Sequence, residues 1–248
     1  MIRITDTVKH LIIINALVFI GTFIYRDQLF EWLALWFPRN EYFGFWQVVS
    51  HMFMHGSFMH IFFNMYALWA FGSPLEQMWG RNRFLFFYFS AGIGAALIHT
   101  GVNYYHFNEG LQALADAGFS KSEVISLLNT GQYNKAWYEV VPKETLESAL
   151  EAFFSPAVGA SGAIYGVLVA FGMLFPNTEL FLLFVPIPIK AKYFIPALIA
   201  LDLFSGLTGY SLFGGSIAHF AHVGGALFGF IMMWYWKKKQ FNNNRWDQ

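Results

Sequence analysis

The chain has 248 residues, of which 56% are hydrophobic and only 12% are charged, about half the charged fraction of a soluble domain. This composition excludes a disordered chain, a collagen-like fibre and a small disulfide scaffold, and it disfavours an ordinary water-soluble fold. Lys and Arg balance Asp and Glu at 15 each, so no basic face predicts nucleic-acid binding, and the absence of cysteine excludes thiolate chemistry.

Six apolar stretches, each close to the width of a bilayer, are predicted to form transmembrane helices. They run over residues 9–25, 57–75, 84–100, 161–175, 188–206 and 216–236. The first follows Arg3 and Lys9 but precedes no small-residue cleavage site, so we expect a retained anchor rather than a signal peptide. The predicted fold is an all-α, polytopic membrane bundle, with residues 1–248 forming one membrane domain.

Six spans place both termini on the same side of the membrane, and the distribution of positive charge predicts which side. Ten of the 15 positive residues fall on the side of the termini: Arg3, Lys9, Arg81, Arg83, Lys190, Lys192, Lys237, Lys238, Lys239 and Arg245. The positive-inside rule therefore predicts cytoplasmic termini, with the loops at 26–56, 101–160 and 207–215 facing outward. We expect the location to be a bacterial cytoplasmic membrane.

The start of the second predicted helix is rich in polar side chains, with His51, His55, His60 and Asn64 in succession. His60 and Asn64 are four residues apart, so they share a helix face and could donate hydrogen bonds to a developing oxyanion. The alternative is that they bond each other or the backbone between helices. We expect His51 and His55 to join the outer loop to the helix ends.

The longest predicted loop, residues 101–156, is the only stretch with the character of a soluble protein. It carries seven acidic residues against three lysines, a net charge of −4. Ser120 and Glu123 form a capping-box pattern, with Gly131 as a stop. Farther on, an apolar repeat of helical spacing follows Pro142: Leu146, Ala149, Leu150 and Phe153. We expect two or three amphipathic helices over the outer face, which could act as a structural cap or select substrates.

The segment from Pro156 to Gly166 contains Ser161 at the start of the fourth predicted helix. That helix would be about 22 Å long, shorter than a hydrocarbon core of about 30 Å, so Ser161 should lie below the outer surface. Pro156 and Gly159 make the preceding chain non-helical, and such backbone is tolerated at membrane depth only beside protein or a water-lined cavity. The sequence therefore predicts that Ser161 lies in a recessed, hydrated pocket.

The sixth predicted helix places His222 on one stripe with Gly225 and Gly229, which lie about 60° and 20° from it. Gly162 and Gly166 form a second pair of small residues, next to Ser161 in the sequence. Small residues let helix backbones approach closely in lipid, so the fourth and sixth helices could touch and bring Ser161 to His222. A serine is activated as a nucleophile when a histidine accepts its proton.

Asp202 is the one acid well inside an apolar span. A carboxylate there is costly and raises the suspicion of a function, such as orienting His222. It also lies near the outer end of the fifth predicted helix, where it could simply reach water. Both interpretations stay open, because a histidine tautomer can be fixed by other partners.

The order His-x4-His-x3-Asn, Gly-Ala-Ser-Gly-Ala and Ala-His-x-Gly-Gly on successive predicted helices resembles the rhomboid intramembrane serine proteases. The matching residues are His55, His60, Asn64, Gly159, Ser161, Gly162, Tyr165, His222 and Gly225. The resemblance implies a six-helix rhomboid bundle, here with an extracytoplasmic helical insertion at 101–156. It also implies a protease that hydrolyses a peptide bond in or next to a transmembrane segment of a client protein.

In residue terms, the resemblance implies that Ser161 is the nucleophile and His222 the general base and acid, as a dyad without an aspartate. It implies that His60, Asn64 and the backbone at Gly159 and Ser161 stabilise the oxyanion or the substrate. Further supporting positions are implied at Tyr165, which packs beside the His222 ring, and at His55, Gly225 and Glu76. Glu76 matches an acidic tie at the cytoplasmic end of the second helix.

Two departures from the family pattern limit the resemblance. The family has a Trp-Arg pair where this chain has Trp46 and Gln47, so an anchoring role for arginine cannot be transferred. The 101–156 insertion is also longer than in the minimal six-helix form. The expected partners are transmembrane substrates and the lipid bilayer, with no metal or organic cofactor and an oligomeric state left open.

Two alternatives belong to other functional classes. One is a proteolytically inactive rhomboid-like protein that only binds membrane clients, although the chain retains both Ser161 and His222. The other is a copper transporter with soft ligands from the 51–60 segment: His51, Met52, Met54, His55, Met59 and His60. Against copper, these residues spread over loop and helix without a compact cage.

Overall fold

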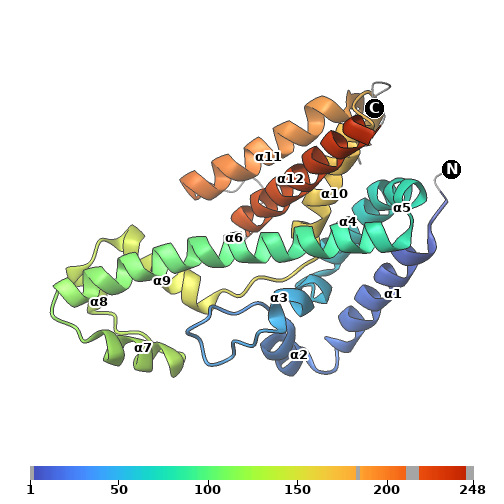
Figure 1. Cartoon of the computed structure of the whole chain (residues 1–248). Helices are drawn as coiled ribbons and strands as arrows, with labels where there is room; N and C mark the ends of the chain where they lie inside the picture. Colours follow the sequence, from blue (N-terminus) through green and yellow to red (C-terminus); the bar gives the residue numbers. More distant parts are fainter. Residues whose placement is uncertain (1–2, 183–184, 211–217, 244–248) are drawn as a thin grey trace.

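The computed structural model describes residues 3–182, 185–210 and 218–243 as a mostly helical chain (Figure 1). The first elements are α1 (Asp6–Gly21), α2 (Arg26–Leu33), α3 (Gln47–Ser50), the 3-10 turn η1 (His51–Phe53), α4 (Phe58–Ala67), the π-helical turn η2 (Leu68–Gly72) and α5 (Ser73–Trp79). They are followed by α6 (Arg81–Asp116), α7 (Lys121–Asn129), α8 (Trp137–Val140), α9 (Lys143–Phe154), α10 (Ser161–Leu174), β1 (Glu179–Leu182), β2 (Val185–Lys190), α11 (Ala191–Thr208) and α12 (His219–Asn243).

Each of the six apolar stretches contains a helix in the structure. The first is α1, the second the continuous run α4–η2–α5, and the others are α6, α10, α11 and α12. The expected start of the last helix at 216, most of the expected loop at 207–215, and Arg245 lie outside the described residues. Two of the described helices, α6 and α11, are long and apolar enough to cross a membrane, and α10 is a shorter apolar helix.

The predicted end of the third helix at residue 100 is wrong, because α6 continues to Asp116. Beyond residue 100 the chain becomes more polar, but Phe107, Leu111 and Leu114 keep a helical spacing and are buried. They pack against the insertion rather than against lipid. Hydropathy alone therefore ends the helix too early.

The all-α fold class is corrected by a short antiparallel hairpin between α10 and α11. β1 pairs with β2 through Glu179 with Lys190 and Leu180 with Ile189. The fifth helix consequently begins at Ala191 rather than at 188. The reason is local: prolines in the sequence VPIPIK lack the amide hydrogen of a helix interior but are tolerated on an edge strand.

Helix α10 lies at the centre of the larger core, and every residue from Gly162 to Phe171 is buried. A Cβ atom added at Gly225 of α12 would collide with the Gly162 carbonyl, and one at Gly229 would lie 2.6 Å from the Cα of Gly166. The close packing predicted for the fourth and sixth helices is therefore confirmed, and it sets the distance between their side chains.

The insertion forms a second core on the far half of α6. Helices α7 and α9 begin and end close to the predicted positions, and Leu146, Ala149, Leu150 and Phe153 are all buried. Ser120 precedes α7 as expected, but its side chain makes no capping hydrogen bond. In Figure 1 the insertion lies at the left, while the start of α1 and the end of α12 lie toward the right.

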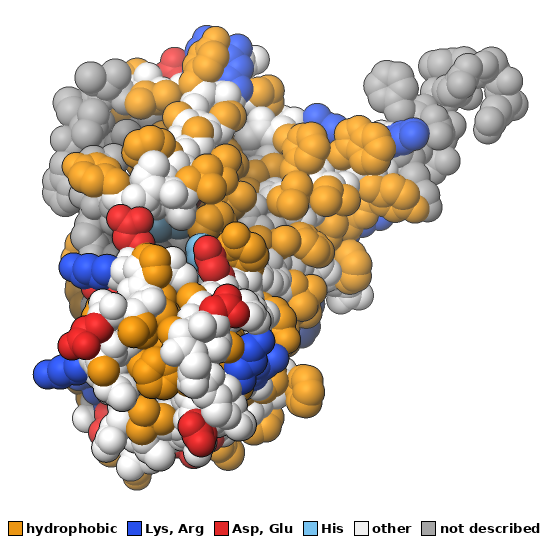
Figure 2. Space-filling model, turned by 90° about the vertical axis from the view of Figure 1, so that its left-hand side faces the viewer, with side chains coloured by type: hydrophobic (Ala, Val, Ile, Leu, Met, Phe, Trp, Pro, Cys, Tyr) orange, Lys and Arg blue, Asp and Glu red, His pale blue; other side chains and the backbone are white. Residues whose placement is uncertain are grey.

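Large apolar side chains are exposed over much of the surface. Phe45 is 86% exposed, Phe23 77% and Leu207 71%. Figure 2 shows apolar side chains over a wide part of one face, with charged and polar groups gathered on the lower lobe. Apolar exposure of this extent is atypical of a soluble monomer and is typical of a surface in contact with lipid.

Candidate active site

Ser161 is the first residue of α10, and the chain before it is non-helical, as the sequence predicts. Ala157 is held by a two-way backbone bridge to Leu35, with N–O distances of 2.9 and 3.0 Å. Gly159 has φ +117°, a conformation that favours glycine, and its N–H donates to the His51 carbonyl at 2.9 Å. These bonds fix the position of the Ser161 side chain.

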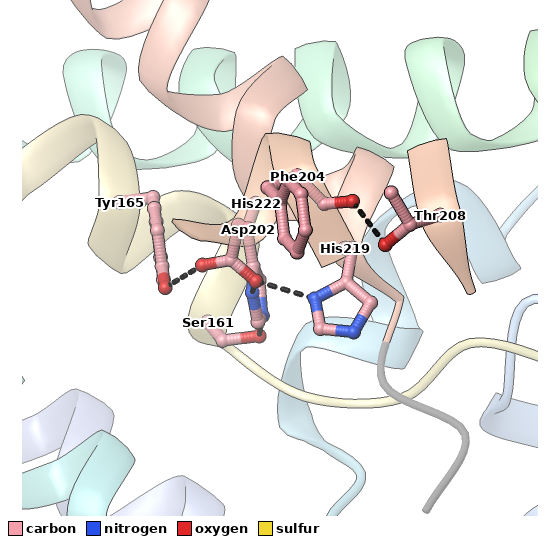
Figure 3. A network of polar contacts seen from close by, with 7 residues as sticks. All are labelled: Ser161, Tyr165, Asp202, Phe204, Thr208, His219 and His222. Carbon is pink, nitrogen blue, oxygen red and sulfur yellow. Dashed lines mark hydrogen bonds and ion pairs between the residues drawn. The ribbon is translucent and has the colours of Figure 1, made fainter. Parts of the chain in front are cut away.

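The structure brings Ser161 and His222 together from α10 and α12. Their Oγ and Nε2 atoms are 2.8 Å apart, a normal hydrogen-bond length (Figure 3). The Tyr165 ring stacks on the His222 ring with centroids 4.3 Å apart and planes 9° from parallel. The imidazole is thus fixed both in position and in tilt.

Asp202 of α11 lies on the other side of the imidazole. Its Oδ1 is 3.1 Å from Nδ1 of His222 and 2.6 Å from Nδ1 of His219, and its Oδ2 accepts a short hydrogen bond from the Tyr165 hydroxyl (Figure 3). Of the two interpretations of Asp202, the structure favours contact with His222 over a carboxylate that reaches water, since the residue is only 7% exposed. Sequence reasoning assigned no role to His219, although its position one helical turn before His222 was a usable signal.

His60 lies beside the backbone that precedes Ser161. A Cβ atom added at Gly159 would lie 2.6 Å from Nε2 of His60 and 3.7 Å from Oγ of Ser161. Nδ2 of Asn64 donates to the His60 backbone carbonyl at 2.8 Å, a bond that uses one of its two amide hydrogens. The His60 ring therefore lies beside the residue two positions before Ser161, and Asn64 follows His60 by one turn of α4.

His55 and His51 are buried against the site. The His55 ring packs edge to face on His60, with centroids 5.0 Å apart. Burial lowers the pKa of His51 to about 4, so its ring is neutral and its Nδ1–H donates to the Gln47 carbonyl at 2.7 Å. His51 stabilises the outer segment and is not placed to react.

Gln47, at the position of the family's arginine, is fully buried and organises the outer segment. Its Nε2 donates to the carbonyls of Tyr42 at 2.7 Å and Glu31 at 3.1 Å, while its Oε1 accepts from the Trp36 N–H at 3.2 Å. An amide can do this because it both donates and accepts, which a guanidinium cannot. Sequence reasoning missed this role.

Glu76 of α5 binds the start of α1. Its carboxylate accepts from the Thr5 hydroxyl and from the backbone N–H groups of Thr7 and Val8, both at 3.0 Å. A carboxylate at a helix N-terminus satisfies otherwise unpaired N–H groups. Glu76 thus joins the first and second long apolar segments.

The copper ligands considered for the 51–60 segment do not share a centre. Met52 packs into the core against Gly92, whereas Met59 is 52% exposed. Within the described residues, the one group of three His or acidic side chains able to converge on a metal ion is Asp202, His219 and His222. Their ligand atoms are already paired by hydrogen bonds.

Comparison with known proteins shows which family the chain belongs to. A family model described as the Rhomboid domain matches residues 42–239. Rhomboid protein 1, mitochondrial, of Saccharomyces cerevisiae is 29% identical over 191 residues, 77% of this chain and 42% of the relative. The human presenilin-associated rhomboid-like protein, mitochondrial, is 30% identical over 184 residues, 74% of this chain and 35% of the relative. This chain thus spans less than half the length of either relative.

Proposed function

Because the chain belongs to the rhomboid family, we propose that it is an intramembrane serine protease that hydrolyses a peptide bond in or next to a transmembrane segment of a client protein. The observation that carries this proposal is the 2.8 Å hydrogen bond between Ser161 and His222. A serine hydroxyl gains nucleophilic power when a histidine is placed to take its proton. The reaction needs no metal or organic cofactor.

In the proposed reaction, Oγ of Ser161 attacks the scissile carbonyl carbon while Nε2 of His222 accepts the hydroxyl proton. The tetrahedral intermediate collapses as the C–N bond breaks, and the same proton passes to the leaving amine. Water then attacks the acyl-enzyme, with His222 again as the base, and releases Ser161. The first of these proton transfers joins two atoms that are 2.8 Å apart, Oγ of Ser161 and Nε2 of His222.

The oxyanion would be stabilised where His60 and the N-terminus of α10 meet. Nε2 of His60 lies against Gly159, and the first backbone N–H groups of a helix are unpaired donors that favour negative charge. Asn64 binds the His60 carbonyl through one of its two amide hydrogens, and we propose that the other donates to the oxyanion. Donors of this kind are worth roughly 3 to 4 kcal/mol each in acyl transfer.

We propose that residues 1–248 form one membrane domain crossing the bilayer six times, with the 101–156 insertion on the side opposite to the termini. The exposed apolar surface and the two long apolar helices support this arrangement. Exposed side chains on α4 and α11, including Phe62 and Phe204, suit lateral entry of a client helix between them. The relatives named above are mitochondrial, so they lend no support to the expected bacterial membrane, and we propose only an integral membrane location.

The direct test is cleavage of a transmembrane substrate by the purified protein in detergent or liposomes. Ser161→Ala and His222→Ala should each abolish cleavage while the protein stays folded. Ser126→Ala on the exposed face of α7 and His106→Ala on α6 are matched controls that should keep full activity. A wild-type protein that binds the substrate without cleaving it would favour the inactive client binder instead.

A further inference from the structure

Asp202, His219 and His222 bring three potential metal-ligand atoms to one place (Figure 3). Oδ1 of Asp202 is 2.6 Å from Nδ1 of His219 and 3.1 Å from Nδ1 of His222, and all three atoms lie within 4.8 Å of one another. The two histidines are three residues apart on α12, so they share one helix face. His219 has no part in the proposed reaction, and its place in this group is unexplained by it.

The spacing of these atoms is close to that of a tetrahedral metal site. Zinc binds imidazole nitrogen at about 2.0–2.1 Å and carboxylate oxygen at about 2.0–2.2 Å, which places neighbouring ligand atoms about 3.3 Å apart. The pair at 3.1 Å already fits, and the pair at 2.6 Å needs to open by roughly 0.7 Å. His219 can supply this movement, because it is the first residue of α12 and its side chain is 15% exposed.

The other polar atoms of Asp202 and His222 already have the hydrogen bonds that metal ligands usually make. Oδ2 of Asp202 accepts from the Tyr165 hydroxyl, which directs Oδ1 toward both rings. Nε2 of His222 lies 2.8 Å from Oγ of Ser161, and that oxygen can accept a hydrogen bond from a protonated Nε2. Carboxylates and imidazoles that bind a metal are normally oriented by partners of this kind.

The charge around Asp202 also favours a cation. Its side chain is only 9% exposed, and within the part of the chain that the structure describes no lysine or arginine forms an ion pair with it. A buried carboxylate is tolerated when it is paired or coordinates a metal ion. Two nitrogen ligands and one oxygen suit zinc, whereas magnesium and calcium prefer sites made of oxygen atoms.

We propose that Asp202, His219 and His222 form an inhibitory zinc site, in which a water molecule supplies the fourth ligand. A neutral imidazole that binds zinc through Nδ1 carries its single hydrogen on Nε2, so the hydrogen that zinc displaces from Nδ1 is held there instead. Nε2 of His222 then donates to Ser161 and cannot accept the serine proton, and the nucleophile is not activated. Zinc binding is independent of the proposed function, but the inhibition rests on it.

Metal binding can be measured without a cleavage assay. Co²⁺ is the probe, because in a tetrahedral site it absorbs visible light far more strongly than the octahedral aqua ion does. We expect the full chain in detergent to bind one equivalent of Co²⁺ with a tetrahedral spectrum, which Zn²⁺ abolishes and Mg²⁺ leaves unchanged. A folded protein that gives no such spectrum would contradict the site.

His219→Gln separates the metal site from the reaction. The new amide can still donate to Oδ1 of Asp202, but it is a poor zinc ligand, so we expect wild-type cleavage in the absence of zinc and no tetrahedral Co²⁺ spectrum. The zinc concentration for half-inhibition should rise roughly 100-fold or more, since loss of an outer partner alone costs about 10- to 100-fold in metal affinity. His106→Ala, which removes a histidine of α6 outside the group, should keep the inhibition seen in the wild type.

The decisive experiment titrates Zn²⁺ into the wild type, His219→Gln and His106→Ala and measures cleavage of one transmembrane substrate and the Co²⁺ spectrum on the same preparations. Zinc should inhibit the wild type, and chelation should restore its full activity. Inhibition that persists unchanged in His219→Gln would overturn the inference, and so would activation of the wild type by zinc. A wild type that does not cleave even after chelation defeats the proposed function, and the Co²⁺ spectra then decide the metal site alone.

Discussion

At the scale of single residues, the reactivity of Ser161 depends on a chain of contacts through three helices. The hydroxyl meets His222 of α12, whose ring is covered by Tyr165 of α10 and faces Asp202 of α11. Tyr165 has two separate contacts here, a stacking contact made by its ring and a hydrogen bond made by its hydroxyl. The two contacts can be separated by one substitution.

Tyr165→Phe keeps the ring stack and removes the hydrogen bond to Asp202. Because Oδ2 loses its donor, the carboxylate is free to turn away from His222, and we expect kcat to fall roughly tenfold. Tyr88→Phe is the control, since the Tyr88 hydroxyl is buried without a hydrogen-bond partner and its removal should leave turnover unchanged. Steady-state kinetics on a transmembrane peptide decide the matter, and equal kcat in both variants would contradict the role given to the hydroxyl.

At the scale of elements, the site exists because α10 and α12 touch along their glycines. Gly162 and Gly166 face Gly225 and Gly229, so the two backbones approach without intervening side chains. This contact places a residue at the start of α10 within 2.8 Å of one near the start of α12. Close backbone approach is the usual device by which helices associate in lipid.

Gly225→Ala should separate the two helices, because the added Cβ would collide with the Gly162 carbonyl. We expect a loss of about 3 kcal/mol or more in stability and a large drop in turnover. Gly101→Ala on α6 meets no atom within 4 Å and should be neutral or slightly stabilising. Denaturation in mixed micelles measures the stability of the two variants. Similar unfolding midpoints for Gly225→Ala and Gly101→Ala would contradict the glycine-mediated contact.

At the scale of the whole molecule, α6 connects two different environments. Its first half packs in the main core around Phe84 and Phe87, and its second half packs against the insertion through Phe107 and Leu111. The insertion therefore lies at the end of α6 away from the chain termini (Figure 1). If α6 crosses the bilayer, its two ends are exposed on opposite sides.

The natural absence of cysteine makes this topology directly measurable. Single substitutions Arg81→Cys, at the start of α6, and Lys121→Cys, in α7, place thiols at exposed positions near its two ends. In oriented vesicles an impermeant maleimide should react with one variant from outside and with the other only after permeabilisation. Labelling of both from the same side would exclude a membrane-crossing α6.

Much of this arrangement could be predicted from sequence, for identifiable physical reasons. Hydropathy located the six apolar helical segments, and the glycine spacing near Ser161 and His222 indicated which helices meet. The end of α6 could not be predicted, because its last turns are stabilised by α9 rather than by lipid. The hairpin before α11 could not be predicted, because an apolar run that contains prolines has the same hydropathy as the start of a membrane helix.

The site was harder to predict than the helices. Which way Asp202 faces depends on the rotation of α11, which its hydropathy pattern does not define, so contact with His222 could only stay one of two interpretations. Gln47 binds backbone carbonyls of the preceding segment, which no local motif indicates. The helical spacing of His219 from His222 does not identify Asp202 as the partner of both rings. The chemical roles of Ser161, His222, His60 and Asn64 stay proposals.

The central claim is that Ser161 is an activated nucleophile held by His222 within a membrane protein. The most direct measurement is covalent labelling by a fluorophosphonate probe, followed by mapping of the modified residue by mass spectrometry. The account predicts stoichiometric modification at Ser161 in the wild type, and none in Ser161→Ala or in the folded His222→Ala variant. Absence of labelling in the folded wild type, or labelling that persists in His222→Ala, would contradict it.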